Sequence, residues 1–277
     1  MCGIIGYTGH RDVQNVILKA LETLEYRGYD SAGMALVCED GQIQVMKRAG
    51  KVAKLRAMCE RQNVQNGRKK ALCGIGHTRW ATHGGVTNEN AHPHTCGRVT
   101  VVHNGIIENY QELTTKYDLT EKMVSQTDTE VVAQLLEYYY RGDVLEAISR
   151  VTARVEGSYA LGIICADCPE KVFAVRKDSP LIVGLGQGEN FIASDIPAIL
   201  SKTRDICRLH DKEIAVLEKD GVQFFNSDME LVEKPVERVQ WDVAAAEKGG
   251  YEHFMMKEIC EQPEALRKTI SPRIREG

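Results

Sequence analysis

The first residues of the chain carry the side chain best suited to covalent chemistry. Cys2 directly follows the initiator methionine, so removal of Met1 would leave a thiol and a free α-amine on one residue. An α-amine has a pKa of about 7.7–8.0 and can accept the proton of a thiol whose own pKa is about 8.5. Cys2 is therefore a candidate nucleophile that carries its own base. The competing interpretation is an incidental cysteine at the start of an ordinary apolar strand.

Hydrolysis of an amide through a thiol also needs hydrogen-bond donors for the oxyanion of the tetrahedral intermediate. Asn104 and Gly105 lie at the end of the apolar run 99–104 and offer a side-chain N–H and an unhindered backbone N–H. We expect these two residues to form an oxyanion hole at the end of a strand. Asn-Gly is also a common turn dipeptide, which is the structural alternative.

Residues 77–84 combine side chains that suit a small zwitterionic substrate. The fork of Arg79 fits a carboxylate bidentately, and Thr82 and His83 can add hydrogen bonds. Asp128 begins a predicted helix and can pair with a substrate ammonium, although it can equally serve as a structural cap.

Two small clusters resemble metal-binding patterns only weakly. His92 and His94 lie near Cys96, and Cys165 and Cys168 form a single CxxC. A zinc site would need two such pairs at finger-like spacing. The glycine-rich run 184–188 lies between two predicted strands and indicates a hairpin turn rather than a phosphate-binding loop. We interpret all three as structural and expect no metal and no cofactor.

Composition excludes several classes of protein. The chain has 277 residues, 43% of them hydrophobic, and a net charge of −4 without a basic tract, so we expect no nucleic-acid partner. No apolar run approaches about 18 residues and the N-terminus lacks a secretory pattern, so we expect neither membrane insertion nor export. The nine cysteines are then expected to be reduced thiols in a cytoplasmic protein.

Hydrophobic periodicity predicts strands on both sides of a helical middle. This order favours an α+β fold over a doubly wound parallel sheet. Asp12 can cap the first helix. The predicted helices cover 13–26, 51–61, 107–116, 128–141 and 143–154, and the strands after the first cover 33–38, 42–48, 72–79, 99–104, 158–165, 171–176, 181–185, 190–194, 206–209, 212–218 and 222–226.

The pattern changes near residue 240, which predicts a domain over 1–240 and a linker with a helical tail over 241–277. The tail 252–268 is predicted to be a helix interrupted or kinked near Pro263. It either packs on another part of a larger protein or folds back on the same domain.

Several motifs, taken together and in order, resemble the class II glutamine amidotransferases. Arg-Gly-Tyr-Asp-Ser-Ala-Gly and Trp-Ala-Thr-His are most similar to the branch that forms amino sugars rather than the purine-pathway branch. The resemblance is carried by residues 2–6, 24–33, 77–84, 91–94, 102–109, 127–130, 189–195 and 253–263.

This resemblance implies an N-terminal-nucleophile fold, a four-layer αββα sandwich. It implies Cys2 as nucleophile, with Asn104 and Gly105 as the oxyanion hole. It also implies that Arg79 binds the α-carboxylate of glutamine and Asp128 its α-ammonium. Thr82 and His83 would line the same pocket, Trp80 would gate the passage of ammonia, and the loop with Arg27 would close nearby.

The resemblance further implies partners. The substrate would be L-glutamine, and the ammonia would pass to a fructose 6-phosphate site in a sugar-isomerase half that this chain lacks. The full-length enzyme would be a dimer. The alternatives are the glutaminase half of another amidotransferase, and a regulatory module that binds glutamine without hydrolysing it.

Overall fold

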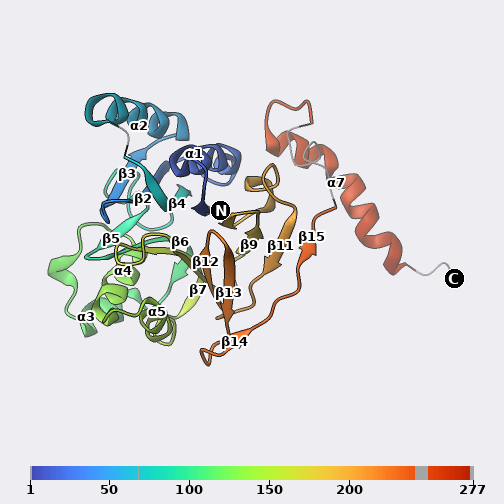
Figure 1. Ribbon diagram of the computed structural model, residues 1–277. Helices are drawn as coiled ribbons and strands as arrows, with labels where there is room; N and C mark the ends of the chain where they lie inside the picture. The colour runs from blue at the N-terminus through green and yellow to red at the C-terminus, as the bar shows by residue number, and fades with distance from the viewer. Residues whose placement is uncertain (1, 68, 241–248, 275–277) are drawn as a thin grey trace. The chain divides into compact units, whose positions relative to one another are not determined.

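The computed structural model describes residues 2–67, 69–240 and 249–274, and the chain divides into two compact units (Figure 1). The first unit runs from Met1 to Val239 and the second from Gln240 to Gly277. The sequence-based boundary lies between residues 240 and 241, one residue further along.

The first sheet of unit 1 has eight strands in the order β15-β11-β9-β10-β1-β4-β2-β3. All neighbouring strands pair antiparallel, and β1 lies between β4 and β10, with Gly3 opposite Thr78 and Ile5 opposite Ala193. The strands are β1 (Gly3–Gly9), β2 (Ser31–Cys38), β3 (Ile43–Ala49), β4 (Ala71–Arg79), β9 (Ile182–Leu185), β10 (Glu189–Ala193), β11 (Asp205–Arg208) and β15 (Glu237–Arg238).

The second sheet has seven strands in the order β14-β13-β12-β8-β7-β6-β5, again antiparallel. Its longest pairing joins β6 and β7 in unbroken register from Val99 opposite Cys165 to Ile107 opposite Gly157. The strands are β5 (His94–Cys96), β6 (Val99–Ile107), β7 (Gly157–Cys165), β8 (Val172–Lys177), β12 (Ile214–Glu218), β13 (Gly221–Phe225) and β14 (Leu231–Val232).

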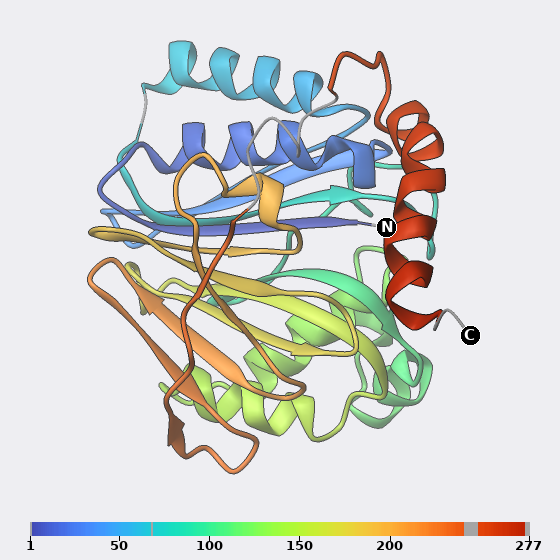
Figure 2. The ribbon, with the colours of Figure 1, turned by 90° about the vertical axis from the view of Figure 1, so that its right-hand side faces the viewer.

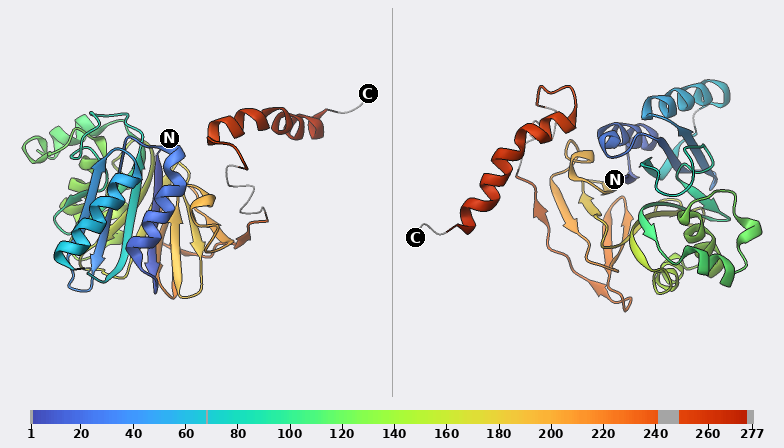
Figure 3. Two further views of the ribbon diagram at one scale, coloured as in Figure 1. Left: turned by 90° about the horizontal axis from the view of Figure 1, so that it is seen from above. Right: turned by 180° about the vertical axis from the view of Figure 1, so that it is seen from behind.

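The helices of unit 1 cover the two outer faces of the stacked sheets, as Figure 2 shows. Seen from above in Figure 3, α1 (Val13–Leu24) and α2 (Val52–Asn66) lie side by side across the first sheet. On the opposite face lie α3 (Tyr110–Lys116), α4 (Asp128–Tyr139) and α5 (Val144–Thr152), of which α4 packs on β6. Short 3-10 helices cover Glu25–Arg27 (η1), Thr120–Lys122 (η2) and Ile196–Ala198 (η3).

Apolar side chains fill the spaces between these layers. Ile4 and Ile75 of the first sheet meet Val102 and Ala174 of the second in one buried core. A second core joins the outer face of the second sheet to α4 and α5, where Leu136 and Ile148 are buried. Each buried side chain of this size stabilises the fold by about 1.5–3 kcal/mol relative to exposure. The four-layer αββα sandwich expected from the sequence is confirmed.

The first helix forms where periodicity predicts it. The Asp12 side chain accepts a hydrogen bond from the backbone N–H of Asn15, and the apolar positions from Val13 to Leu24 face the sheet. The helix ends at Leu24 and continues into η1, which carries Arg27.

Two predictions around Asn104 and Gly105 were wrong in detail, and the helix predicted over 51–61 continues to Asn66. The strand expected over 99–104 continues to Ile107, so Asn104 and Gly105 lie inside β6 and form no turn. The helix expected from 107 consequently begins at Tyr110. The nine-residue register with β7 outweighs the turn propensity of Asn-Gly. The short strands β5, β14 and β15 were not predicted, because two or three residues carry no measurable periodicity.

Unit 2 contains α7 (Phe254–Ile270) and the 3-10 helix η4 (Ser271–Arg273). Pro263 lies inside α7, so of the two predicted forms, an interrupted or a kinked helix, the interrupted one is wrong. Among the described residues, no helix has both the length and the apolar character that a membrane span requires.

Candidate active site

Cys2 lies directly before β1, next to the end of β4. Its sulfur accepts a hydrogen bond from the backbone N–H of Trp80 at 3.2 Å and lies 3.5 Å from the Trp80 carbonyl oxygen. Because Gly3 pairs with Thr78, the sheet register itself brings Cys2 beside Trp80. Residue 2 and the 80–83 segment are therefore adjacent because β1 and β4 are neighbours.

Two side chains from different elements hold the main chain of Cys2. Its carbonyl oxygen accepts one hydrogen bond from Arg27 Nε and another from Asn104 Nδ2, each at 3.0 Å. Arg27 belongs to η1, beside the first sheet, and Asn104 to β6 of the second. The main chain of Cys2 is thus fixed between the two sheets.

The electrostatics around Cys2 keep its thiol protonated near neutral pH. Burial raises the pKa of the thiol, against the opposing effects of the Trp80 N–H, the positive charge at the chain start, Arg79 and Arg27. A thiol in this state needs a base before it can attack a carbonyl group. The expected removal of Met1, which would supply that base, concerns a residue outside the described ranges.

A narrow cleft opens beside the Cys2 sulfur and contains most of the predicted site residues. Trp80 and Thr82 are exposed at this cleft, whereas Arg79 and Asp128 are buried. Asn104 and Arg27 reach the site instead through the Cys2 carbonyl oxygen. The lining residues are Cys2, Arg79, Trp80, Thr82, His83, His92, His103, Gly105, Thr127, Asp128 and Thr129.

Arg79 ends β4 and organises the loop that follows it. Its Nη1 donates to the Gly85 carbonyl oxygen at 3.0 Å, and its Nη2 donates to the His83 carbonyl oxygen. Burial lowers the pKa of this guanidinium, while the nearby Asp128 and Cys2 act to raise it. A guanidinium has five N–H donors, so these two bonds leave donors for a ligand.

Asp128 is the first residue of α4, but it does not cap that helix. Its Oδ2 accepts a hydrogen bond from the backbone N–H of Ile107 at 2.8 Å and lies 3.9 Å from His103 Nδ1. The N-cap position belongs to Thr127. The structural alternative considered for Asp128 is therefore replaced by a link from α4 to β6 at the cleft.

Gly105 has a backbone conformation that only glycine adopts readily. Its φ is +130°, and a Cβ at this position would overlap the carbonyl oxygen of Ser158 on the neighbouring strand. Gly28 is also required, because a Cβ there would come within 2.7 Å of the Arg79 carbonyl carbon. Both glycines therefore allow close backbone approaches around the cleft.

Sequence reasoning assigned no role to four lining residues, namely His92, His103, Thr127 and Thr129. Each lies within a motif that carried the resemblance, so the only available signal was its proximity to the assigned residues. All four side chains are buried. His103 Nδ1 is 2.9 Å from Thr129 Oγ1, and the backbone N–H of His103 donates to His92 Nδ1 at 3.3 Å. Thr127 Oγ1 lies instead 3.1 Å from His94 Nε2.

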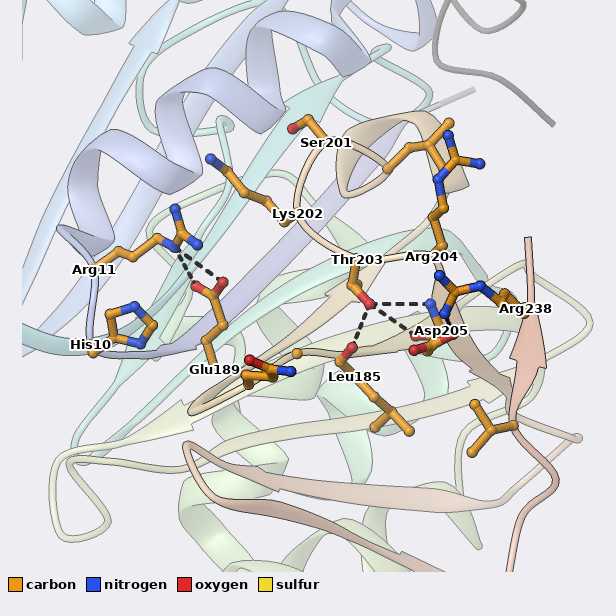
Figure 4. A pocket seen from close by; sticks show the side chains of 14 residues that line it. His10, Arg11, Leu185, Glu189, Ser201, Lys202, Thr203, Arg204, Asp205 and Arg238 are labelled. Atoms are coloured by element: carbon orange, nitrogen blue, oxygen red, sulfur yellow. Dashed lines mark hydrogen bonds and ion pairs between the residues drawn. The ribbon is translucent and has the colours of Figure 1, made fainter. Parts of the chain in front are cut away.

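A wider hollow elsewhere in unit 1 has a different character (Figure 4). Its acidic residues are engaged by arginines: Glu189 pairs with Arg11 at 2.9 Å, and Asp205 pairs with Arg238 at 2.9 Å. Its lining contains neither a thiol nor a predicted site residue. Most of the predicted site residues therefore line the cleft at Cys2 and none lines this hollow.

Comparison with solved structures supports the fold. A glutamine phosphoribosylpyrophosphate amidotransferase from B. subtilis, complexed with ADP and GMP, aligns over 83% of this chain and 50% of its own, with a TM-score of 0.67 and 21% identity. An allosteric regulatory enzyme of purine biosynthesis aligns over the same shares with a TM-score of 0.68 and 23% identity.

Sequence comparison gives the family. A family described as a glutamine amidotransferase domain matches residues 77–201. A glutamine–fructose-6-phosphate aminotransferase [isomerizing] from Clostridium perfringens is 53% identical over 100% of this chain, and one from Thermus thermophilus is 47% identical over 100%. The chain spans 45% of the length of each of these relatives. Residues 77–201 of this chain therefore belong to the glutamine amidotransferase domain family.

Proposed function

We propose that this chain hydrolyses L-glutamine to glutamate and ammonia through a thioester on Cys2. The observation that carries the proposal is the position of the Cys2 sulfur. It lies 3.2 Å from the Trp80 N–H, in a cleft that contains a guanidinium and a carboxylate. These groups are complementary to the α-carboxylate and α-ammonium of an amino acid.

The cleft offers a place for each end of the substrate. Arg79 would bind the α-carboxylate through donors that its two carbonyl bonds leave unused, and Asp128 would bind the α-ammonium. Thr82 and His83 would add hydrogen bonds from the same loop. Held in this way, the side-chain amide of glutamine would extend toward the Cys2 sulfur.

The reaction proceeds in two stages. The α-amine of Cys2 takes the thiol proton, and the sulfur bonds to the amide carbon of glutamine to give a tetrahedral oxyanion. The C–N bond then breaks as the ammonium returns its proton to the leaving nitrogen, which releases ammonia and leaves a thioester. Water gives a proton to the amine and attacks the thioester, the C–S bond breaks, and glutamate leaves with the thiol restored.

Two donors are available for the oxyanion. One N–H of the Asn104 amide donates to the Cys2 carbonyl oxygen, and the second remains for the substrate. The N–H groups of His103 and Ile107 both donate away from β7, to His92 and Asp128. By the alternation of a strand, the Gly105 N–H between them is directed to the same side. Each oxyanion donor stabilises the transition state by about 2.7–4 kcal/mol.

For the whole protein, we propose that the ammonia is transferred to fructose 6-phosphate. The relatives named as aminotransferases for this sugar are about twice as long as this chain, so the acceptor site would lie in the further half. Trp80 is 45% exposed at the cleft and contacts Tyr29 edge-on at 5.6 Å, a position suited to gating the passage of ammonia. A glutaminase unit over 1–240, a linker and tail over 241–277, and a dimeric cytoplasmic enzyme remain parts of this proposal.

The test combines intact mass with ammonia release from glutamine, using wild type and Cys2→Ala. A chain that lacks Met1 and turns over glutamine, with turnover abolished in Cys2→Ala, is the expected result. Diazo-oxo-norleucine should label Cys2, and the exposed Cys260 serves as an internal control for general thiol reactivity. Folded chain without Met1 that neither turns over glutamine nor is labelled would favour a non-catalytic glutamine-binding module. Glucosamine 6-phosphate formation by the full-length enzyme tests the acceptor.

A further inference from the structure

His77 lies in β4, within hydrogen-bond distance of the residue assigned to the oxyanion hole. Its Nε2 is 3.0 Å from Asn104 Oδ1 and 2.9 Å from the carbonyl oxygen of His103. Both neighbouring oxygens are acceptors only, so Nε2 must carry the proton and donate to them. His77 is 1% exposed, so water does not compete for this N–H.

The ring of His77 is held in place by a second histidine. It stacks on His92 with ring centroids 4.0 Å apart and an interplanar angle of 12°. The orientation of His92 is fixed in turn, because its Nδ1 accepts the backbone N–H of His103. The donor that faces Asn104 is therefore part of a rigid, buried arrangement.

We infer that His77 is a positioning residue for the proposed glutamine hydrolysis. It fixes the side-chain amide of Asn104 with its NH₂ group toward Cys2 and the oxyanion. The inference rests on the proposed function. By accepting from His77, Oδ1 is held away from the reacting carbon, and Nδ2 is left to donate to the Cys2 carbonyl oxygen. An amide turned by 180° would instead present a carbonyl oxygen to the developing negative charge.

The charge state of His77 fits a donor rather than a proton shuttle. Burial lowers its pKa to about 3, despite the opposing effect of its hydrogen bond to Asn104. Its Nδ1 is buried without a hydrogen-bond partner. The ring is therefore neutral at working pH and its single proton is committed to Asn104 and His103.

The first measurement compares wild type with His77→Phe and His77→Gln in the glutaminase assay. Phenylalanine keeps the stacking on His92 and removes the donor, whereas glutamine retains an N–H. We expect kcat to fall about 10- to 100-fold in His77→Phe, with KM for glutamine within about threefold of wild type, and His77→Gln to recover part of kcat. Alkylation of Cys2 by iodoacetamide, which develops no oxyanion, should keep its wild-type rate.

A double-mutant cycle with Asn104→Ala separates positioning from general damage. If His77 acts through Asn104, His77→Phe should change kcat by less than about threefold in the Asn104→Ala background. An equal loss in both backgrounds, or an unchanged kcat in His77→Phe, would overturn the inference while leaving glutamine hydrolysis in place. Absence of turnover by wild type lacking Met1 would overturn the proposed function and this inference with it. Thermal unfolding of each variant identifies any that fail to fold. If His77→Phe does not fold, the same comparison of kcat in the two backgrounds is made with His77→Gln.

Discussion

Arg27 donates a hydrogen bond from Nε to the carbonyl oxygen of Cys2 at 3.0 Å. The same guanidinium donates from Nη1 to Asp195 Oδ2 at 2.9 Å, and the two side chains are 9% and 29% exposed. Tyr26 also donates to Asp195 Oδ2. Asp195, which follows β10, thus helps to fix the main chain of the candidate nucleophile through Arg27.

Replacing Asp195 by asparagine should lower activity without removing any group from the cleft. The change removes the negative charge that pairs with Arg27. We expect this to weaken the interaction of Arg27 with the Cys2 carbonyl oxygen by about 1–2 kcal/mol and to lower kcat about tenfold. The measurement is ammonia release at saturating glutamine. Asp205→Asn is the matched control, since Asp205 pairs with Arg238 at the same distance of 2.9 Å on an exposed surface. Equal losses in the two variants would contradict the prediction.

Gly105→Ala should destabilise the fold and abolish hydrolysis. The new Cβ would overlap the Ser158 carbonyl oxygen, and φ of +130° is strained for alanine. Backbone strain and overpacking together should cost about 2–5 kcal/mol of the free energy of unfolding. Urea denaturation measures this loss. Gly221→Ala is the control, because a Cβ there meets nothing within 4 Å, and a similar loss in it would refute this account.

Much of the fold could be predicted because its elements are long and periodic. The apolar spacing of α1, from Val13 to Leu24, and its Asp12 cap are local signals, and the structure has both. The continuation of β6 through Asn104 and Gly105 could not be predicted locally. It depends on pairing with β7, whose residues lie about 50 positions further along the chain.

The site divides in the same way. The residue type alone indicates what charged and nucleophilic side chains can do, as for Cys2, Arg79 and Asp128. The structure brings these three residues to one cleft. The positions of His77 and Asp195 follow from contacts between distant strands and loops, which no spacing within the sequence encodes. A histidine in a strand is often a core residue whose hydrogen bonds are only structural. Only the residue to which it is bonded distinguishes this from a role in the site.

Asp128→Asn should weaken glutamine binding selectively. Asparagine can still accept the Ile107 N–H through its oxygen, so the link between α4 and β6 is kept while the negative charge is lost. Losing a charge-assisted hydrogen bond of about 1.5–3 kcal/mol should raise KM for glutamine at least about tenfold. An analogue that lacks the α-ammonium should show the same KM with both proteins. If the Asp128→Asn substitution raised KM equally for glutamine and for the analogue, Asp128 would not be the partner of the substrate ammonium.

The buried histidines should make the fold sensitive to acid. Burial lowers the pKa of His77 to about 3 and those of His92 and His94 well below the usual value. In the unfolded chain their pKa is about 6.5, so below that pH the unfolded state binds more protons than the folded state. The stability that depends on these neutral histidines is therefore fully present above about pH 6.5 and is lost as pH falls toward 3.

His94→Gln tests this directly. His94 is buried, and the nearby cations Lys47 and Arg79 act with burial to keep it neutral. Each such histidine should make unfolding easier by up to about 1.4 kcal/mol per pH unit below 6.5, so His94→Gln should lose less stability than wild type between pH 7.5 and 5.0. Urea unfolding at both pH values measures the slope, and the exposed His10→Gln should retain the wild-type value. A wild-type slope in His94→Gln would mean that His94 binds its proton equally well in the folded and unfolded states, which contradicts the prediction.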